Sequence, residues 1–179
     1  MAGKIILETE RLILREFDEG DVEAFYVLGS DPVIIRHTLD PGGGLRSLEH
    51  AREILRSAPM ADYQKHGFGR WAVVLKANGE VIGFAGLKHL DDLGEVDVGY
   101  RLMPAYWGKG LATEANRPTI EYGFTRLRLP RIIGLVDPAN TASVRVLQKL
   151  GLTYAGNIDF RGSSLARYVI EAPTAPPAG

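Results

Sequence analysis

A glycine-rich turn between a predicted strand and a predicted helix constrains this chain most. The strand covers residues 95–103, the turn contains Gly108 and Gly110, and the helix begins near Leu111. Glycines at alternate positions let the backbone turn tightly and approach a ligand closely. The first amides of a helix have no internal acceptors and lie at the positive end of the helix dipole. The stretch therefore fits either a phosphate-binding turn or an ordinary strand-to-helix loop.

The spacing of this turn excludes two common nucleotide-binding motifs. A Walker A loop requires a glycine five residues before a Gly-Lys pair, and Ser or Thr directly after the pair. Met103 and Gly110 occupy those two positions. A Rossmann fingerprint requires a third glycine or alanine and an acidic residue about twenty positions later. Thr113 stands at the former position and residues 128–131 contain no acid, so neither an NTP nor a dinucleotide is indicated.

Apolar patterns and turn signals predict one mixed domain. Asn78-Gly79 between two apolar runs predicts a hairpin, Asn140 is a suitable N-cap, and Gly151 is suited to end a helix. Strands are predicted at 11–17, 68–76, 80–90, 95–103, 131–136, 153–157 and 166–171. Helices are predicted at 21–29, at 48–65 with a break at Pro59, from the turn to about 127, and at 141–150. This order predicts an α/β (α+β) fold with a mixed, mainly antiparallel sheet of about six to seven strands flanked by helices.

Composition limits the classes of function. The length of 179 residues fits a single domain, predicted at 1–171, with a disordered Pro/Ala-rich tail at 172–179. The 21 basic and 22 acidic residues leave a formal charge of -1, without the basic field that nucleic acid requires. Cysteine is absent, which excludes disulfides and a cysteine nucleophile. No signal-peptide pattern or long apolar run occurs, so we expect a cytoplasmic protein without a membrane partner, either a monomer or a homodimer.

The histidines give no reason to expect a metal. They are scattered along the chain without the spacing of a ligand set, at His37, His50, His66 and His89. A solvated or core role fits each of them better than metal binding.

Five segments of the chain occur in the order found in one enzyme family. They are TERLILREF, WAVVLKANGEVIGFAGL, VDVGYRL, YWGKGLATEA and NTASVRVLQKLGL. Through them, residues 7–172 resemble the GNAT superfamily of N-acetyltransferases and, within it, the branch of ribosomal-protein N-terminal (Rim-type) acetyltransferases. The resemblance implies a sheet whose strands splay apart at the centre. It also implies acetyl-CoA as the co-substrate, with no metal.

The resemblance further implies which residues bind acetyl-CoA. The pyrophosphate motif of the family, Q/R-x-x-G-x-G/A, corresponds to residues 107–112, with Trp107 in place of the polar first residue. The phosphate contacts are expected from the main-chain amides of Gly108, Lys109, Gly110, Leu111, Ala112 and Thr113. The pantetheine arm is expected to pair with the backbone of Arg101, Leu102 and Met103 and to face Asn140.

Two carboxylates are candidates for the base that removes a proton from the attacking amine. Glu95 and Asp97 alternate with apolar residues, so both point to one face, about 7 Å apart along the strand. They fit the solvated side of a half-exposed strand equally well. The family places a base on this strand, and its Rim-type branch has Glu where this chain has Asp97. Asp159, near a strand–loop junction, is a weaker third candidate.

The acid that protonates the departing thiolate is less clear from the sequence. Many GNAT members use a tyrosine on the helix after the fifth core strand, but Leu147 occupies that position. Ser143 matches a serine of the Rim-type branch and would relay a proton, although a capping role fits it equally well. Some family members need no essential acid, because holding the two substrates close together and excluding water is enough for the reaction. A backbone amide near Leu102 or Met103 is the expected donor to the oxyanion.

The acceptor is the part that the sequence defines least. We expect direct attack by a primary amine in a ternary complex, with the α-amine of a protein or peptide N-terminus as the leading acceptor. A small-molecule amine such as an aminoglycoside, a polyamine or an amino acid is the alternative. A non-catalytic acyl-CoA sensor is the competing class, and it is favoured only if no acid or base is present.

Overall fold

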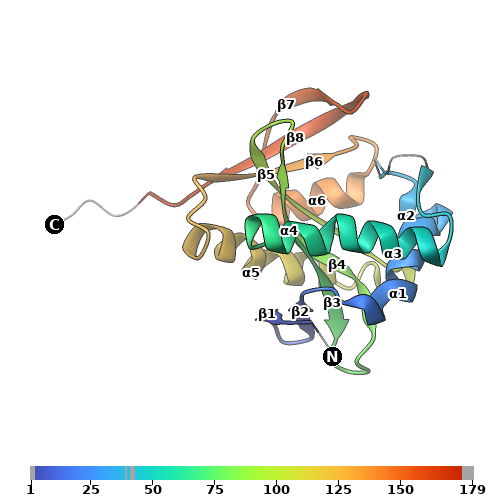
Figure 1. Cartoon of the computed structure of the whole chain (residues 1–179). Coiled ribbons are helices and arrows are strands. Elements are labelled where there is room, and N and C mark those ends of the chain that lie inside the picture. Colours follow the sequence, from blue (N-terminus) through green and yellow to red (C-terminus); the bar gives the residue numbers. More distant parts are fainter. Residues whose placement is uncertain (1–2, 39, 41–42, 175–179) are drawn as a thin grey trace.

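The computed structural model describes residues 3–38, 40 and 43–174, which form one sheet with helices packed against it (Figure 1). The described strands follow the order β1-β2-β3-β4-β5-β6-β8-β7 across a sheet of eight strands. Their bounds are β1 Ile5–Glu8, β2 Leu12–Arg15, β3 Arg70–Leu75, β4 Val81–Leu90, β5 Glu95–Leu102, β6 Arg131–Val136, β7 Thr153–Phe160 and β8 Ser163–Glu171. The predicted mixed fold is confirmed.

The sheet has one strand more than the predicted maximum of seven. The additional strand is β1, which pairs with β2 at the edge of the sheet. Its four residues are too few to display an alternating pattern, and it is half exposed, so the sequence contained no signal for it. The last residues of the predicted tail, 175–179, lie outside the described residues.

The sheet divides between β5 and β6, as the family resemblance implied. β4 and β5 pair along their length from Gly83↔Leu102 to Leu90↔Glu95. β5 and β6 run parallel and pair at Asp97↔Ile133 alone among the described residues. The two strands therefore separate beyond Asp97, and the end of β5 that leads to the glycine-rich turn lies beside a gap.

Helices cover both faces of the sheet. Their bounds are α1 Val22–Ser30, α2 Pro32–Ile35, α3 Leu48–Ser57, α4 Pro59–His66, α5 Leu111–Thr125 and α6 Thr141–Lys149. Trp71 and Val73 of β3 lie in the same core as Ile120 of α5, whereas Ala72 packs with Leu55 of α3. Because alternate residues of a strand face opposite sides, α5 and α3 cover different faces, as Figure 1 shows. No helix in the described ranges is both long and apolar enough to cross a membrane.

Local signals set the helix ends that the sequence predicted. The Ser47 hydroxyl accepts a hydrogen bond from the His50 amide at 3.1 Å and caps α3. The break at Pro59 separates α3 from α4. α5 continues through Pro118, which lacks the N–H that would donate to the Glu114 carbonyl. The helices that carry the predicted site thus begin where expected.

Candidate functional site

The glycine-rich turn lies between the end of β5 and the start of α5. Leu102 ends β5, and a short 3-10 helix, Pro104–Tyr106, leads into the turn. Gly108 and Gly110 have φ angles of +71° and +75°, in the left-handed region that favours glycine. The Gly110 carbonyl accepts from the Glu114 amide at 3.0 Å. The helical amides before Glu114 therefore have no acceptor within the helix and suit an anion.

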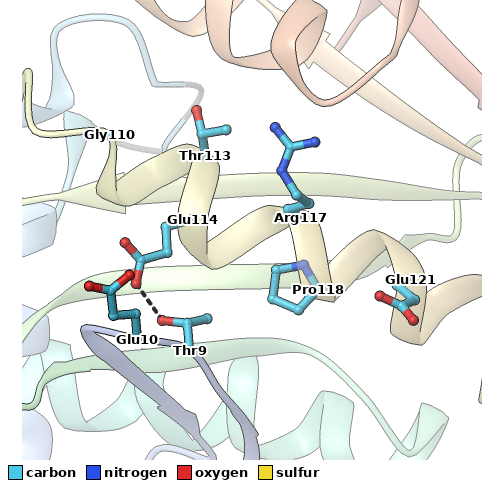
Figure 2. Close-up of a pocket in the computed structure, with 8 residues that line it drawn as sticks. All are labelled: Thr9, Glu10, Gly110, Thr113, Glu114, Arg117, Pro118 and Glu121. Atoms are coloured by element: carbon cyan, nitrogen blue, oxygen red, sulfur yellow. Dashed lines mark hydrogen bonds between the residues drawn. The ribbon is translucent and has the colours of Figure 1, made fainter.

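Arg11 holds this turn from outside. Its guanidinium donates to the Lys109 carbonyl at 3.1 Å and to the Glu114 carboxylate at 2.6 Å. The Thr9 hydroxyl also donates to Glu114, at 2.6 Å (Figure 2). Burial opposes ionisation of Glu114, but the hydrogen bonds from Thr9 and Arg11 outweigh it and lower the pKa of this carboxyl. No pattern in the sequence indicates this contact, because it joins residues more than ninety positions apart.

An open hollow of about 520 Å³ borders the turn (Figure 2). It is lined by Thr9, Glu10, Gly110, Thr113, Glu114, Arg117, Pro118 and Glu121. Two of these, Gly110 and Thr113, belong to the predicted phosphate-binding turn, while Leu111 between them is buried in the core. Lys109 lies exposed with its ammonium 5.7 Å from the Tyr106 ring. Two of the six predicted phosphate-binding residues, Gly110 and Thr113, therefore border this hollow at the anchored start of α5.

A pair of hydroxyls connects β5 to the start of α6. The Tyr100 phenol lies 3.0 Å from the Ser143 hydroxyl. The Ser143 amide donates to the Asn140 side-chain oxygen at 3.2 Å, so Asn140 is the predicted N-cap of α6. Burial raises the pKa of Tyr100, while the hydrogen bond with Ser143 lowers it. Tyr100 was missed by the sequence analysis, because only the fold brings it to Ser143.

The backbone N–H and C=O groups at the end of β5 face either β4 or the gap, depending on the residue. The Met103 amide donates to the Ile82 carbonyl of the β4 side at 2.9 Å, and the Met103 carbonyl accepts from Tyr106 at 2.9 Å. Successive residues of a strand direct their backbone groups to opposite edges, so Leu102 faces the β6 side. The Trp107 indole donates to the Leu102 carbonyl at 2.7 Å on that side. The Leu102 amide is therefore directed toward the gap, and the Met103 amide is already bonded.

The backbone of Arg101, two residues before Met103, faces β4 as the backbone of Met103 does. It pairs in register with Phe84 of β4, and its side chain lies over the Phe84 ring, 5.2 Å from the centroid. The guanidinium donates to the Leu28 carbonyl at 3.1 Å and to Asp40 at 2.9 Å. Arg101 thus faces the helices α1–α4. Its predicted contact with pantetheine, like that of Met103, stays a prediction that this orientation does not favour.

Asp97 is buried at the point where β5 and β6 separate. Its carboxylate pairs with Arg70 and accepts a hydrogen bond from the Leu135 amide at 3.0 Å. Arg70 also donates to the Asp97 carbonyl at 2.9 Å and to the Gly86 carbonyl. Burial raises the pKa of Asp97, and the charge of Arg70 opposes that rise. Asp97 is consequently a carboxylate with a raised proton affinity that is already tied to a guanidinium.

The other two candidate carboxylates lie farther from the gap. Glu95 pairs with Arg131 and Arg167, each at 3.0 Å, near the opposite end of β5. Asp159 is exposed on β7, and β6 and β8 lie between β7 and β5. Ser143 and Asp97 are therefore the two predicted catalytic residues that border the gap.

Comparisons with known proteins agree with this fold. The model of the acetyltransferase (GNAT) domain matches residues 11–153. The uncharacterized N-acetyltransferase p20 of Bacillus licheniformis is 34% identical over 153 residues, covering 84% of this chain and 83% of its own. The spermidine N(1)-acetyltransferase of Escherichia coli K12 is 25% identical over 148 residues, 81% of this chain and 74% of its own. The solved RimL ribosomal L7/L12 α-N-protein acetyltransferase in complex with coenzyme A has a TM-score of 0.78 at 19% identity and covers 94% and 98% of the two chains.

The chain belongs to the GNAT family of acetyltransferases and is an N-acetyltransferase. Members of this family use acetyl-CoA as the co-substrate. The turn combines left-handed glycines with helical amides that have no acceptor within the helix, and phosphate binding there stays a prediction. The likeness to RimL concerns the fold alone. Relatives named for a polyamine and neighbours named for a protein acceptor occur together, so the Rim-type branch is not singled out.

The ionised Glu114 should stabilise the anchored turn in a pH-dependent way. Its pKa in the folded protein lies below the reference value of 4.5, so its contribution is complete above about pH 4.5 and is lost as the pH falls through the folded pKa. We expect Glu114→Gln to lower the free energy of unfolding most at pH 7, with the difference shrinking toward pH 3. Urea denaturation of both proteins across this range measures it. Glu10→Gln in the same hollow is the control, and a pH-independent difference for Glu114→Gln would contradict the assignment.

Proposed function

We propose that this N-acetyltransferase transfers the acetyl group of acetyl-CoA to the α-amine of a protein or peptide N-terminus, by direct attack in a ternary complex. The observation that supports this acceptor is that three carboxylates on the α1–α4 side of the sheet, each at most about a third exposed, are already paired with a cation. The pairs are Asp97 with Arg70, Asp40 with Arg101 at 2.9 Å, and Asp62 with Lys88 at 3.0 Å. A polyamine carries several positive charges and favours unpaired carboxylates, whereas a peptide N-terminus carries one charge and several carbonyls that suit arginine.

The second candidate acceptor is a polyamine. It is favoured by the relative of Escherichia coli that is named a spermidine N(1)-acetyltransferase. The charge pairing on the α1–α4 side disfavours a polyamine, since displacing Arg70 or Arg101 from its carboxylate would cost part of the binding energy.

Acetyl-CoA binding is proposed to follow the gap from the turn inward. The amides of Gly108–Thr113 would hold the pyrophosphate at the start of α5. Tyr100 and Leu102, whose backbone groups face β6, would pair with the pantetheine arm, and the Asn140 side chain would border it. Each residue of a strand advances about 3.4 Å, so an arm that enters at Leu102 brings its thioester toward Tyr100 and Asp97.

In the proposed reaction, the neutral amine attacks the thioester carbon, a carbon–nitrogen bond forms and the carbon–sulfur bond breaks. The Tyr100 amide, deeper in the gap than Leu102, donates to the oxygen on which negative charge develops. Asp97 takes the proton that the amine loses, through water, because its raised pKa favours protonation. Glu95 lies about 7 Å farther from the gap and is the weaker base. The Ser143 hydroxyl donates a proton to the thiolate and takes one from the Tyr100 phenol. Water then carries the proton held by Asp97 back to the Tyr100 phenolate, which restores both groups.

The acceptor class is tested by thiol release with three substrates at equal concentration. They are a short peptide with a free N-terminus, the same peptide with a blocked N-terminus and an internal lysine, and spermidine. We expect the highest kcat/KM for the free N-terminus and none above background for the blocked peptide. Turnover of spermidine without turnover of the free peptide would reject the proposal and support the polyamine acceptor.

A substitution in the turn should weaken acetyl-CoA binding through the backbone alone. In Gly110→Ala the new Cβ has room, with its nearest neighbour 3.8 Å away, but φ of +75° strains any L side chain. Relief of that strain moves the amides of the turn, so we expect at least a tenfold loss of acetyl-CoA affinity by isothermal titration calorimetry. Gly79→Ala, in the hairpin with the same φ of +75°, is the matched control and should bind normally. Equal affinity of the two variants would argue against phosphate binding at this turn.

Ser143 and Tyr100 should act as one unit in the proton transfer. We expect Ser143→Ala and Tyr100→Phe each to lower kcat about tenfold to a hundredfold while the Kd of acetyl-CoA changes less than about twofold. Because each residue acts through the other, the double variant should be no slower than the slower single variant. Steady-state kinetics with titration calorimetry measures this, and Thr141→Ala, an exposed hydroxyl on the same helical turn, is the control. If the two decreases in kcat multiply in the double variant, Ser143 and Tyr100 act independently and the prediction is wrong.

A further inference from the structure

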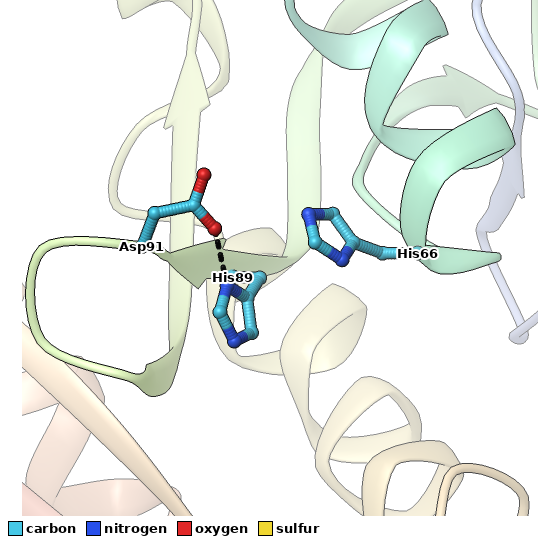
Figure 3. Close-up of side chains that lie close together, drawn as sticks. All are labelled: His66, His89 and Asp91. Atoms are coloured by element: carbon cyan, nitrogen blue, oxygen red, sulfur yellow. Dashed lines mark hydrogen bonds and ion pairs between the residues drawn. The ribbon is translucent and has the colours of Figure 1, made fainter.

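A cluster of potential metal ligands lies at the far end of β4 from the glycine-rich turn. His66 is the last residue of α4, His89 lies near the end of β4, and Asp91 directly follows that strand. Figure 3 shows the His66 ring facing His89 and Asp91 across the space between the helix and the strand. One ligand atom from each of the three residues lies within 4.8 Å of the others. The fold thus gathers side chains whose spacing in the sequence gave no sign of a site.

The present contacts of the cluster show what an ion would replace. The His89 Nδ1 lies 2.8 Å from one Asp91 carboxylate oxygen, and the Lys65 ammonium lies 2.8 Å from the other. The His66 and His89 rings stack with centroids 4.8 Å apart. Both histidines are half buried, whereas 64% of the Asp91 side chain is exposed. The rings are therefore held in place while the carboxylate stays accessible to an ion from solvent.

We propose that His66, His89 and Asp91 bind one zinc ion. Two imidazole nitrogens and one carboxylate oxygen form a zinc ligand set, with a fourth position open to water. Imidazole nitrogens suit zinc and disfavour calcium and magnesium, which prefer oxygen ligands. Zinc bonds of about 2.0–2.1 Å place tetrahedral ligand atoms about 3.3–3.4 Å apart. Rotation of the exposed Asp91 side chain and small movements of the two half-buried rings cover the change from the present separations, which are within 4.8 Å.

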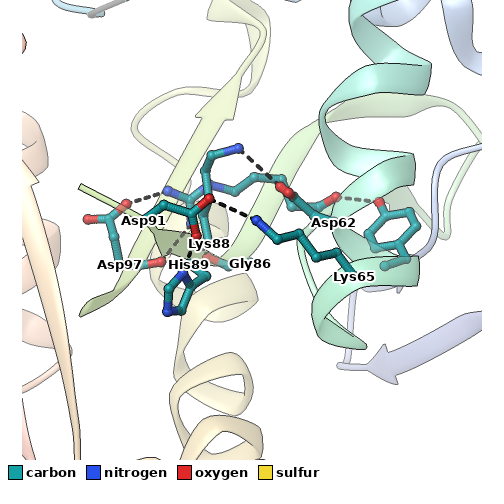
Figure 4. A network of polar contacts seen from close by, with 9 residues as sticks. Asp62, Lys65, Gly86, Lys88, His89, Asp91 and Asp97 are labelled. Atoms are coloured by element: carbon teal, nitrogen blue, oxygen red, sulfur yellow. Dashed lines mark hydrogen bonds and ion pairs between the residues drawn. The ribbon is translucent and has the colours of Figure 1, made fainter. Parts of the chain in front are cut away.

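The ion would occupy the position between the His89 Nδ1 and the Asp91 carboxylate, where one hydrogen bond now joins them. His66 would supply the third ligand from α4, so the ion would link the end of α4 to the end of β4. Lys65 competes for the same carboxylate, since its ammonium neutralises Asp91. The neighbouring Asp62–Lys88 pair, also between α4 and β4, does not involve the three ligands (Figure 4). His89 pairs in register with Val96, on the far side of Asp97 from the glycine-rich turn, so the site lies beyond the apex of the acetyl-transfer gap.

Titration calorimetry of the untagged protein with zinc chloride tests the proposal. We expect one ion per chain, and at least tenfold weaker binding in each of His66→Ala, His89→Ala and Asp91→Asn. His50→Ala, which removes a histidine of α3 outside the cluster, should bind like the wild type. Thermal denaturation in the presence of a chelator verifies that each variant is folded. If a histidine variant does not fold, Asp91→Asn tests the site instead, because its side chain is exposed.

Lys65→Ala should change the zinc affinity in the opposite direction to the three ligand variants. Removing the competing ammonium should tighten zinc binding up to about fivefold, the range expected for one exposed ion pair. Tighter binding in Lys65→Ala together with weaker binding in His66→Ala and His89→Ala identifies the site, because a nonspecific surface affinity would survive the loss of one imidazole. Absence of zinc binding in the wild type, or equal zinc affinity in the wild type and in the folded ligand variants, would overturn the proposal.

Discussion

The separation of β5 from β6 is the constraint on which the rest of this structure depends. One pairing, Asp97↔Ile133, joins the two strands, and beyond it the β6-facing backbone of β5 has lost its sheet partner. Buried backbone groups need hydrogen bonds, because leaving them unmade costs their full desolvation energy. The Trp107 indole satisfies the Leu102 carbonyl from the side. The other groups on this edge suit an extended ligand that pairs with a strand, and the pantetheine arm of acetyl-CoA is such a ligand.

The opening of the sheet is stabilised where it begins by a side-chain network. The guanidinium of Arg70, from β3, reaches the Gly86 carbonyl of β4 and both the carbonyl and the carboxylate of Asp97 on β5. The Asp97 carboxylate then accepts the Leu135 amide of β6. Four strands are thus tied together at the apex of the gap by two side chains. Since removing one member of a buried ion pair leaves the other uncompensated, Asp97 has a structural role whatever part it plays in catalysis.

Local signals were readable from the sequence, whereas contacts between distant segments were not. Asn78-Gly79 identified the hairpin, Pro59 the break between α3 and α4, and Asn140 the cap of α6, because each acts within a few residues of itself. The Arg11–Glu114 ion pair joins segments 103 residues apart and depends on how the β1–β2 turn lies on α5. No pattern in a single sequence specifies such a register. The glycine-rich turn could be predicted because its constraint, a positive φ, is also local.

The same distinction applies to the proposed acid. The sequence identified Ser143 and the loss of the family tyrosine at Leu147, but gave no replacement for it. A Cβ on Gly134 of β6 would lie 2.6 Å from Leu147, so the leucine packs directly against the Gly134 backbone. Tyr100 instead extends its phenol from β5, on the other side of the gap, to the first turn of α6. In the proposed mechanism, the phenol that other family members carry on the helix is supplied by the strand, and Ser143 lies within hydrogen-bonding distance of it.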